Sequence, residues 1–504
     1  MRGDVSTKDR VIIIGAGMGG LAAALTLVSR GREVLVLERA GSPGGKMREI
    51  VVEGRGIDSG PTVLTLRHVF EQLFQEAGAE LASSVPMTKA AVIARHAWPD
   101  GSRLDLHADR ARSADEIGVL AGREAARGYL EFCDRARRIY EFLEPSFIQK
   151  PRPGVSDLVR SAGITGIGSL WAVTPFRNLW DELGRYFPDQ RLRQLYGRYA
   201  TYCGSSPFSS PATLMLVAHV EQEGVWLVDR GMHALAQAMA RVAETAGAVF
   251  RYGSEVGEIL VEGGRVHGVR LVSGEQIEAG AVVSNADISA LSLGLLGRAA
   301  TAAVARDEIG PASLSAMTWS ATAQVRGFEL SRHNVFFGPS SVEEFGDIFS
   351  RSRLPRDPTV YVCAQDRDGA MAGGGADQPD RLLVIVNAPA TAQSQAFSPS
   401  ELDQCHAAMI RSLQRCGLQI AIEKMVMTTP RDFAKQYPGT NGALYGAASH
   451  DWMGAFRRPG ARSRLPGLYL AGGSVHPGPG LPMAALSGRM AALACLADRA
   501  STSR

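Results

Sequence analysis

A glycine-rich segment close to the N-terminus constrains the fold of this chain more than any other feature. An apolar run, Val11–Ile14, is followed by the turn GAGMGG and then by an Ala- and Leu-rich stretch, Leu21–Val28. This order predicts a β-strand, a tight turn and an α-helix. Gly15 permits the turn, Gly17 lets the backbone approach a pyrophosphate, and Gly20 lets helix and strand pack closely. The amides at the helix N-terminus then favour a bound anion.

An acidic residue follows the next predicted strand, Glu33–Leu37. A carboxylate about 20 residues past such a turn accepts hydrogen bonds from a ribose diol. Glu38 occupies that position, and its charge disfavours a ribose that carries an extra phosphate, as in NADP. The N-terminal segment is therefore predicted to bind a dinucleotide.

Two further segments indicate which dinucleotide is bound. Gly45 and Lys46, in the sequence GGKM, supply backbone for a second approach to the pyrophosphate or to a ribityl chain. The sequence RGIDSGP, Arg55–Pro61, predicts a strand and turn beneath an isoalloxazine ring. A simple NAD dehydrogenase needs neither segment. The arrangement resembles the FAD-binding signature shared by amine oxidases and carotenoid desaturases, and the resemblance implies FAD.

A second glycine-rich segment, LYLAGGSVHPGPGLP, begins at Leu468 and leads into a predicted helix, Ala484–Ala500. The helix N-terminus can direct its amides at the N1–C2=O edge of a flavin, where negative charge gathers on reduction. The alternative is a Pro/Gly loop that only caps a C-terminal helix. His476 is the one histidine of this motif, and a structural role in the turn is favoured over a catalytic one.

The residues predicted to contact FAD come from both ends of the chain and from one central strand, whose Val256 backbone the resemblance places near the adenine. They are Gly15, Gly17, Gly20, Glu38, Gly45, Lys46, Val256, Gly472, Gly473, Gly480, Pro482 and Met483.

The length of 504 residues predicts two domains, and the motif positions make them discontinuous. The fold class is α/β, with a Rossmann-type FAD-binding domain and an inserted α+β substrate domain. We expect the FAD-binding domain from segments 1–80, 226–300 and 461–504. The substrate domain is expected from segments 81–225 and 301–460.

Composition excludes several other classes of protein. A net charge of +3 gives no reason to expect nucleic acid as a partner. The six cysteines are scattered without a CxxC pair, which predicts reduced thiols and no metal site. The apolar stretch from Val11 to Val28 imitates a membrane span, but its glycine spacing favours the turn and helix. No other segment has the ~20 apolar residues that a spanning helix needs, so a soluble or peripheral protein is expected.

A predicted helix in the first inserted segment leaves two interpretations open. Phe176, Leu179, Trp180, Leu183 and Phe187 recur at helical spacing, with charged residues between them. The face is either part of the core, or the wall of a lipophilic tunnel or a membrane-surface helix.

Several motifs together resemble the bacterial phytoene-desaturase family over essentially the whole chain. They are Tyr199–Pro207, Pro211–Thr213, His219–Glu221, Gly224–Trp226, Gly231-Met232, His333–Gly338, Pro358–Cys363 and the C-terminal GGSVHPGPGLP. The combination of PAT, HVEQEGVW and RGM is most similar to the branch that acts on acyclic 1-hydroxy- and 1-methoxycarotenoids. That likeness implies introduction of the C3–C4 double bond, with hydride passing to the flavin and then to an unidentified acceptor, oxygen or a quinone.

The resemblance also implies a location and a pair of polar residues. A polyene substrate implies contact with a membrane surface, so the protein is expected at the cytoplasmic face of the inner membrane as a peripheral protein. Asp157 and Arg160 match an Asp-x-x-Arg pair placed near the flavin in phytoene desaturases. They are the catalytic candidates, and a solvent-exposed ion pair is the alternative.

Three other functions stay open at this point. A phytoene or neurosporene desaturase would form several double bonds, a non-catalytic FAD protein would only bind carotenoid, and an amine oxidase would need an aromatic cage. A requirement for the C1 oxygen predicts polar groups in the substrate site. The candidates are Tyr199, Tyr202 and His219, and each has a structural alternative.

Overall fold

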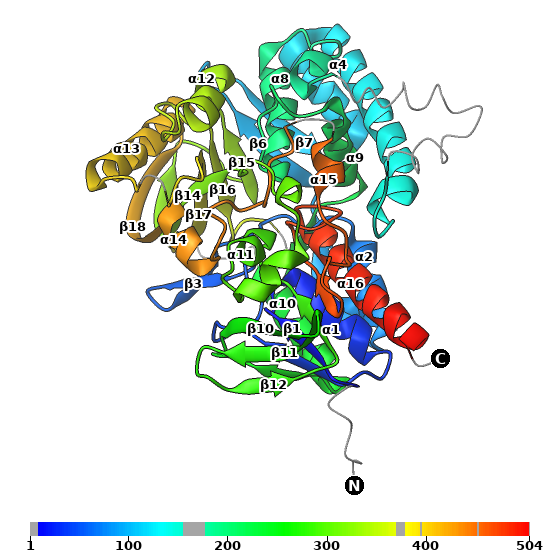
Figure 1. Ribbon diagram of the computed structural model, residues 1–504. Helices are drawn as coiled ribbons and strands as arrows, with labels where there is room; N and C mark the ends of the chain where they lie inside the picture. Colours follow the sequence, from blue (N-terminus) through cyan, green and yellow to red (C-terminus); the bar gives the residue numbers. More distant parts are fainter. Residues whose placement is uncertain (1–8, 155–176, 369–377, 394–395, 451–452, 503–504) are drawn as a thin grey trace, which may run out of the picture.

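The structure is a computed structural model that describes residues 9–154, 177–368, 378–393, 396–450 and 453–502. Five sheets are present in these residues, the three largest with five, three and seven strands, and helices pack around them (Figure 1). The N- and C-terminal segments lie side by side in the lower part of the view, where α1 and α16 are neighbours.

A parallel sheet forms the first layer, and its strands come from the beginning, middle and end of the chain. In spatial order they are β19 (Leu468–Leu470), β13 (Ala281–Ser284), β1 (Val11–Ile14), β2 (Val34–Leu37) and β9 (Val249–Arg251). Strands β19, β13 and β1 are buried and β2 is nearly so, as expected for parallel strands covered on both faces, whereas the edge strand β9 is partly exposed. The Rossmann-type fold predicted from sequence is confirmed.

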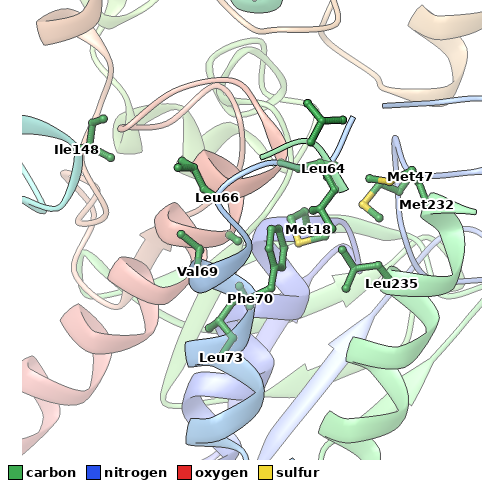
Figure 2. Close-up of a cluster of buried hydrophobic side chains, with 14 of the residues drawn as sticks. Met18, Met47, Leu64, Leu66, Val69, Phe70, Leu73, Ile148, Met232 and Leu235 are labelled. Atoms are coloured by element: carbon green, nitrogen blue, oxygen red, sulfur yellow. The ribbon is translucent and has the colours of Figure 1, made fainter. Parts of the chain in front are cut away.

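Helices α1 (Met18–Val28), α10 (Met232–Thr245) and α16 (Leu481–Thr502) pack together beside this sheet, and α2 (Arg67–Glu76) packs against α1 and α16. The helices approach closely because glycines face one another. A Cβ atom on Gly488 of α16 would lie 2.0 Å from the carbonyl oxygen of Gly19 in α1. Around the start of α1 the side chains are apolar, as Met18, Phe70 and Leu235 show (Figure 2).

A small antiparallel sheet adjoins the parallel one. It contains β10 (Val256–Glu262), β11 (Arg265–Leu271) and β12 (Gln276–Glu278). Its apolar side chains form a separate core with Ile14 and Leu37, the last residues of β1 and β2.

A larger mixed sheet forms the second part of the molecule. In spatial order it contains β18 (Gln419–Thr428), β14 (Ser315–Arg326), β17 (Asp380–Ala388), β16 (Val360–Ala364), β15 (His333–Phe336), β6 (Val92–Ala97) and β7 (Arg103–His107). Helix α13 (Pro399–Arg415) covers one face, packing Met409 and Leu413 against Trp319 (Figure 1). Strands β6 and β7 thus share a sheet with strands that follow residue 300. The domain boundaries expected from the sequence stay predictions.

The opposite side of this region is helical. Its elements are α4 (Arg110–Leu143), which bends at Gly122, followed by the π-helical turn η2 (Glu144–Ile148), α7 (Leu179–Leu183), α8 (Gln190–Gly197), the 3-10 turns η3 (Arg198–Cys203) and η4 (Ala212–Met215), and α9 (Leu216–Glu223). The hairpin of β3 (Glu49–Val52) and β4 (Arg55–Asp58) packs against β14, β17 and β18 of the large sheet. Strands β5 (Met87–Lys89) and β8 (Trp226–Val228), which are far apart in the chain, pair in a second two-stranded antiparallel sheet.

The remaining elements are short and lie at the edges of these layers. They are α3 (Leu81–Ser84), α11 (Ile288–Ser292), η5 (Arg298–Ala303), η6 (Arg306–Glu308), α12 (Ser341–Phe345), η7 (Gly346–Ser350), α14 (Pro430–Gln436) and α15 (Gly454–Arg457).

The amphipathic helix predicted around Phe176–Phe187 is wrong in length. Of residues 177–187, which the structure describes, only α7 is α-helical, because Asn178 caps its first turn through a bond from the Asp181 amide and Gly184 ends it. Leu179, Leu183 and Phe187 are fully buried, as the core interpretation predicts. Phe176 lies outside the described residues.

Candidate cofactor and substrate site

The glycine turn after β1 leaves the N-terminus of α1 open. Gly17 is the N-cap, no side chain accepts from the first amides, and the first turn holds no acidic residue. Gly15 has a φ of +90°, which favours glycine. A Cβ atom on Gly20 would lie 2.0 Å from the Gly15 carbonyl oxygen, so only glycine fits there. This arrangement suits a pyrophosphate, which binds uncapped helix amides.

The second glycine pair lies directly beside the first turn. The Gly44 amide donates to the Ala16 carbonyl at 2.8 Å. A Cβ atom on Gly45 would lie 3.1 Å from Gly17 Cα. Lys46 turns away from the glycines, and its Nζ donates to the Leu444 carbonyl at 2.5 Å. Burial lowers the pKa of Lys46, and its contact with a cofactor stays a prediction.

Glu38 lies where a ribose is expected. Its Oε2 accepts from the Ala16 amide at 2.6 Å, and its Oε1 accepts from the Ala40 amide at 2.8 Å. The chain leading into β10 passes alongside, because the Ser254 amide donates to the Glu38 carbonyl. Val256 is buried in the core with Ile14 and Leu37, so its side chain packs below this end of the sheet.

The C-terminal turn reaches the same point from the other side. Gly472 has a φ of +111°, and its amide donates to Ser487 Oγ in α16. Gly480, with a φ of +112°, precedes α16, whose first residues include the buried Pro482 and the half-buried Met483. The Gly473 carbonyl accepts a hydrogen bond from the Arg458 guanidinium, which also donates to the Ala447 carbonyl.

Asn285 is a contact that sequence reasoning did not single out. It follows β13, and a Cβ atom on Gly17 would lie 2.6 Å from its Nδ2. A Cβ atom on Gly19 would lie 2.6 Å from its Oδ1 and 2.7 Å from the Gly472 amide. The sequence did contain a signal for Asn285, its position directly after a predicted strand, because polar residues at the carboxyl ends of parallel strands lie where ligands bind.

His476 has a structural role in this turn. Its Nε2 pairs with the Phe147 carbonyl at 3.1 Å, and its ring packs edge-on against the Phe147 ring. Burial lowers the pKa of His476 to about 4, so the imidazole is neutral at physiological pH. It thereby joins the C-terminal turn to η2. The catalytic candidates Asp157 and Arg160 lie outside the described residues.

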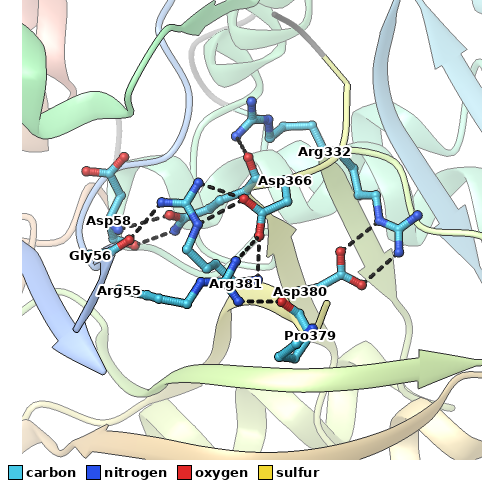
Figure 3. Close-up of polar contacts among 10 residues, drawn as sticks. Arg55, Gly56, Asp58, Arg332, Asp366, Pro379, Asp380 and Arg381 are labelled. Carbon is cyan, nitrogen blue, oxygen red and sulfur yellow. Dashed lines mark hydrogen bonds and ion pairs between the residues drawn. The ribbon is translucent and has the colours of Figure 1, made fainter. Parts of the chain in front are cut away.

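The turn predicted beneath the isoalloxazine is fastened to the mixed sheet by a polar network (Figure 3). Gln365 bonds both the amide and the carbonyl of Asp58, at 3.0 and 2.8 Å. Arg381 donates to the Gly56 carbonyl and pairs with Asp366. The Asp58 carboxylate in turn accepts from the first amides of α10. These bonds fix the segment that leads to Thr62.

A cavity opens beside this segment, between the mixed sheet and the helices. The mixed sheet forms one wall. Val335 lies between His96 and Tyr361, its register partners on the neighbouring strands, so the three side chains share a face. His333, two residues before Val335 on β15, lies on the same face. The opposite wall comes from α8, η3 and α9. Its residues are Leu195, Arg198, Tyr199, Tyr202 and Glu221.

A buried acid and two phenols form the polar part of the helical wall. Tyr199 donates to Glu221 Oε2 at 2.6 Å, and Tyr202 also bonds this carboxylate. Burial raises the pKa of Glu221. Tyr199 and Tyr202 therefore line the cavity, and their contact with a substrate oxygen stays a prediction. His219 does not, since its ring packs against Tyr140 and its Nε2 faces Glu223.

A hydrogen-bonded chain crosses the sheet wall. The Tyr361 hydroxyl lies 2.7 Å from Thr62 Oγ1 and 2.8 Å from His333 Nδ1. His333 is 2% exposed, and its Nε2 has no hydrogen-bond partner among the described residues. Burial lowers the pKa of His333 to about 3. A neutral imidazole thus faces a cavity whose lining also includes the ionisable residues Arg198 and Glu221.

Comparison with known proteins agrees with this geometry. The family described as flavin containing amine oxidoreductase matches residues 18–496. The fold is similar to that of putrescine oxidase bound to putrescine, with a TM-score of 0.59, 15% identity, and 97% and 99% of the two chains covered. The chain belongs to the flavin-containing amine oxidoreductase family, and its cofactor is FAD.

Within that family the similarity is more specific. The chain is 50% identical to the hydroxyneurosporene desaturase of Rubrivivax gelatinosus, covering 98% of this chain and 94% of the relative. It is 41% identical to the hydroxyneurosporene desaturase of Cereibacter sphaeroides, covering 98% and 99%. The protein is therefore an FAD-dependent oxidoreductase of the carotenoid desaturase type, as its motifs predicted.

Proposed function

We propose that this protein introduces the C3–C4 double bond into acyclic 1-hydroxy- or 1-methoxycarotenoids. The full-length identity of 50% to a hydroxyneurosporene desaturase carries the proposal. The cavity supports it, because half of its lining residues are apolar and one of these, Val63, lies two residues after the segment expected beneath the isoalloxazine. An apolar enclosure suits a polyene, whose burial is favourable.

In this reaction the protein's own residues bind and orient the cofactor and the carotenoid. The open amides of α1, Glu38 and the second glycine pair hold the dinucleotide part of FAD. The cavity holds the end of the carotenoid and excludes water. Bound FAD would supply the redox chemistry, because a flavin ring can accept a hydride. The sheet and helix walls fix which carbon pair is presented.

The electrons must leave the flavin after each turnover, and the acceptor we propose is oxygen or a quinone. We also propose that the protein works at the cytoplasmic face of the inner membrane as a peripheral protein. Among the described residues, no helix is long and apolar enough to cross a bilayer.

Product analysis tests the proposed reaction. Purified protein with bound flavin would be given liposomes that contain 1-hydroxyneurosporene, neurosporene or phytoene, and the carotenoids would be separated by chromatography. We expect one added double bond in the hydroxylated substrate. Conversion of phytoene to lycopene would instead establish a multi-step desaturase. A Gly17→Val variant without flavin serves as the control for non-enzymatic oxidation.

A further inference from the structure

The position of the substrate oxygen restricts which group can bind it. In the proposed reaction the oxygen is attached to C1 and the oxidised bond begins at C3, so only C1 and C2 lie between the oxygen and that bond. A group that binds this oxygen must therefore lie at the flavin end of the cavity. We take that end to be near Val63, which lines the cavity two residues after the turn Arg55–Pro61, and near Tyr361, which bonds Thr62.

The phenols on the helical wall are already engaged. Tyr199 and Tyr202 both bond the Glu221 carboxylate. Breaking either bond would leave part of a buried carboxylate without a partner, which is costly. These residues serve better as a fixed polar wall than as the group that binds the substrate oxygen.

His333 differs from them because one of its nitrogens is unused. Its Nδ1 pairs with Tyr361, and Tyr361 pairs with Thr62, so the ring is held in place from the flavin side. Its side chain lines the cavity, is 98% removed from solvent, and has no described partner for Nε2. A buried polar atom without a partner is uncommon in folded proteins and requires an explanation.

We propose that His333 Nε2 binds the C1 oxygen of the carotenoid and thereby selects oxygenated substrates for C3–C4 oxidation. This inference rests on the proposed function. If Tyr361 donates to Nδ1, the Nε2–H group donates to a hydroxyl or a methoxy oxygen. If Nδ1–H donates to Tyr361, the Nε2 lone pair accepts from a hydroxyl alone.

Two substitutions at His333 test the roles of the two ring nitrogens individually. His333→Asn keeps a polar group near the Nδ1 position, next to Tyr361, and removes Nε2. His333→Gln extends an amide to the Nε2 position. His219→Leu is the matched control, because this partly buried histidine lies outside the cavity lining. Bound flavin and thermal unfolding would be measured for each variant.

The readout is selectivity, the ratio of kcat/KM for 1-hydroxyneurosporene to that for neurosporene, which lacks the oxygen. We expect His333→Asn to lower this ratio on the order of tenfold, as for loss of one hydrogen bond, and His333→Gln to retain part of it. The His219→Leu ratio should equal that of the wild type. Unchanged selectivity in His333→Asn with flavin bound would overturn the assignment.

The same experiment distinguishes failure of this inference from failure of the proposed function. Wild-type protein that does not oxidise the hydroxylated substrate at C3–C4 contradicts the function itself. Wild-type protein that does so, with selectivity independent of His333, contradicts only the role of the histidine.

Discussion

Two neighbours, Asn285 and the N-terminus of α1, limit the space around Gly17. Its backbone, with φ of −73° and ψ of 177°, is open to any residue, so glycine is required for space and not for conformation. A Cβ atom would lie 2.6 Å from Asn285 Nδ2 and would stand above the open amides of α1. The side chain of any other residue therefore occupies the room that the pyrophosphate needs.

Gly17→Val is expected to fold and to lose nearly all bound FAD. The ratio of flavin to protein absorbance after purification measures the loss. Gly41→Val is the matched control, because Gly41 is exposed and a Cβ atom there would meet nothing within 4 Å. Stoichiometric flavin in Gly17→Val would show that this turn does not hold the cofactor.

A buried carboxyl makes stability depend on pH. Glu344 accepts from Thr359 Oγ1 at 2.7 Å, and its other oxygen has no partner among the described residues. Burial raises the pKa of Glu344 from 4.5 to about 7. The folded state therefore holds a proton that the unfolded state releases between these values. Its contribution to stability is full below pH 4.5 and is lost as pH rises through 7.

Glu344→Gln should remove this dependence. At pH 8 the variant is expected to be more stable than the wild type, by roughly 3 kcal/mol at most for a shift of this size. Below pH 4.5 the two should be alike. Denaturant unfolding at several pH values measures the difference, with the exposed neighbour change Glu343→Gln as control. A constant difference across pH would contradict the assignment.

Among the elements, α1 and α16 depend on each other although they lie at opposite ends of the chain. Gly488 allows them to touch, since its Cβ would lie 2.0 Å from the Gly19 carbonyl oxygen. The Gly472 amide, which bonds Ser487 in α16, lies against Gly19 as well. The first turn of α1 and the C-terminal turn are thus positioned by one helix contact.

Gly488→Leu is expected to force these helices apart and to lower both the melting temperature and bound FAD. An overpacked core position costs typically 1–3 kcal/mol. Thermal unfolding and flavin content measure the two effects. Ala500→Leu, at the exposed end of the same helix, should change neither. Full flavin content and stability in Gly488→Leu would mean that the helices do not need this contact.

At the scale of the whole molecule, the substrate determines where the protein must work. A carotenoid does not dissolve in water, so it has to pass from a bilayer into the cavity without crossing solvent. No described helix can span the membrane. The proposed association is therefore with the surface.

High salt, carbonate or mild detergent should release the protein from cell membranes. Fractions would be separated by centrifugation and assayed for protein and bound flavin, with an integral membrane protein of the same host as control. Retention after all of these treatments would contradict peripheral association.

The turns expected to hold FAD could be located from the sequence because their signals are local. The turns after β1 and β19 are marked by glycines within a few residues of an apolar strand. The acid at position 38 follows its strand directly, and most predicted strands and long helices match the structure within a few residues. Asn285 was missed because its neighbours Gly17 and Gly472 are distant in the sequence.

The sequence by itself determined the cofactor, the discontinuous α/β fold and the class of reaction, because each depends on residues adjacent in the chain or on a full-length pattern. Only the tertiary structure revealed the cavity that we propose for the substrate. Thr62, Glu221, His333 and Tyr361 come from four separate segments, and strand pairing and helix packing bring them together. Neither the unpaired nitrogen of His333 nor the pairing of Glu221 with two tyrosines has any local signature.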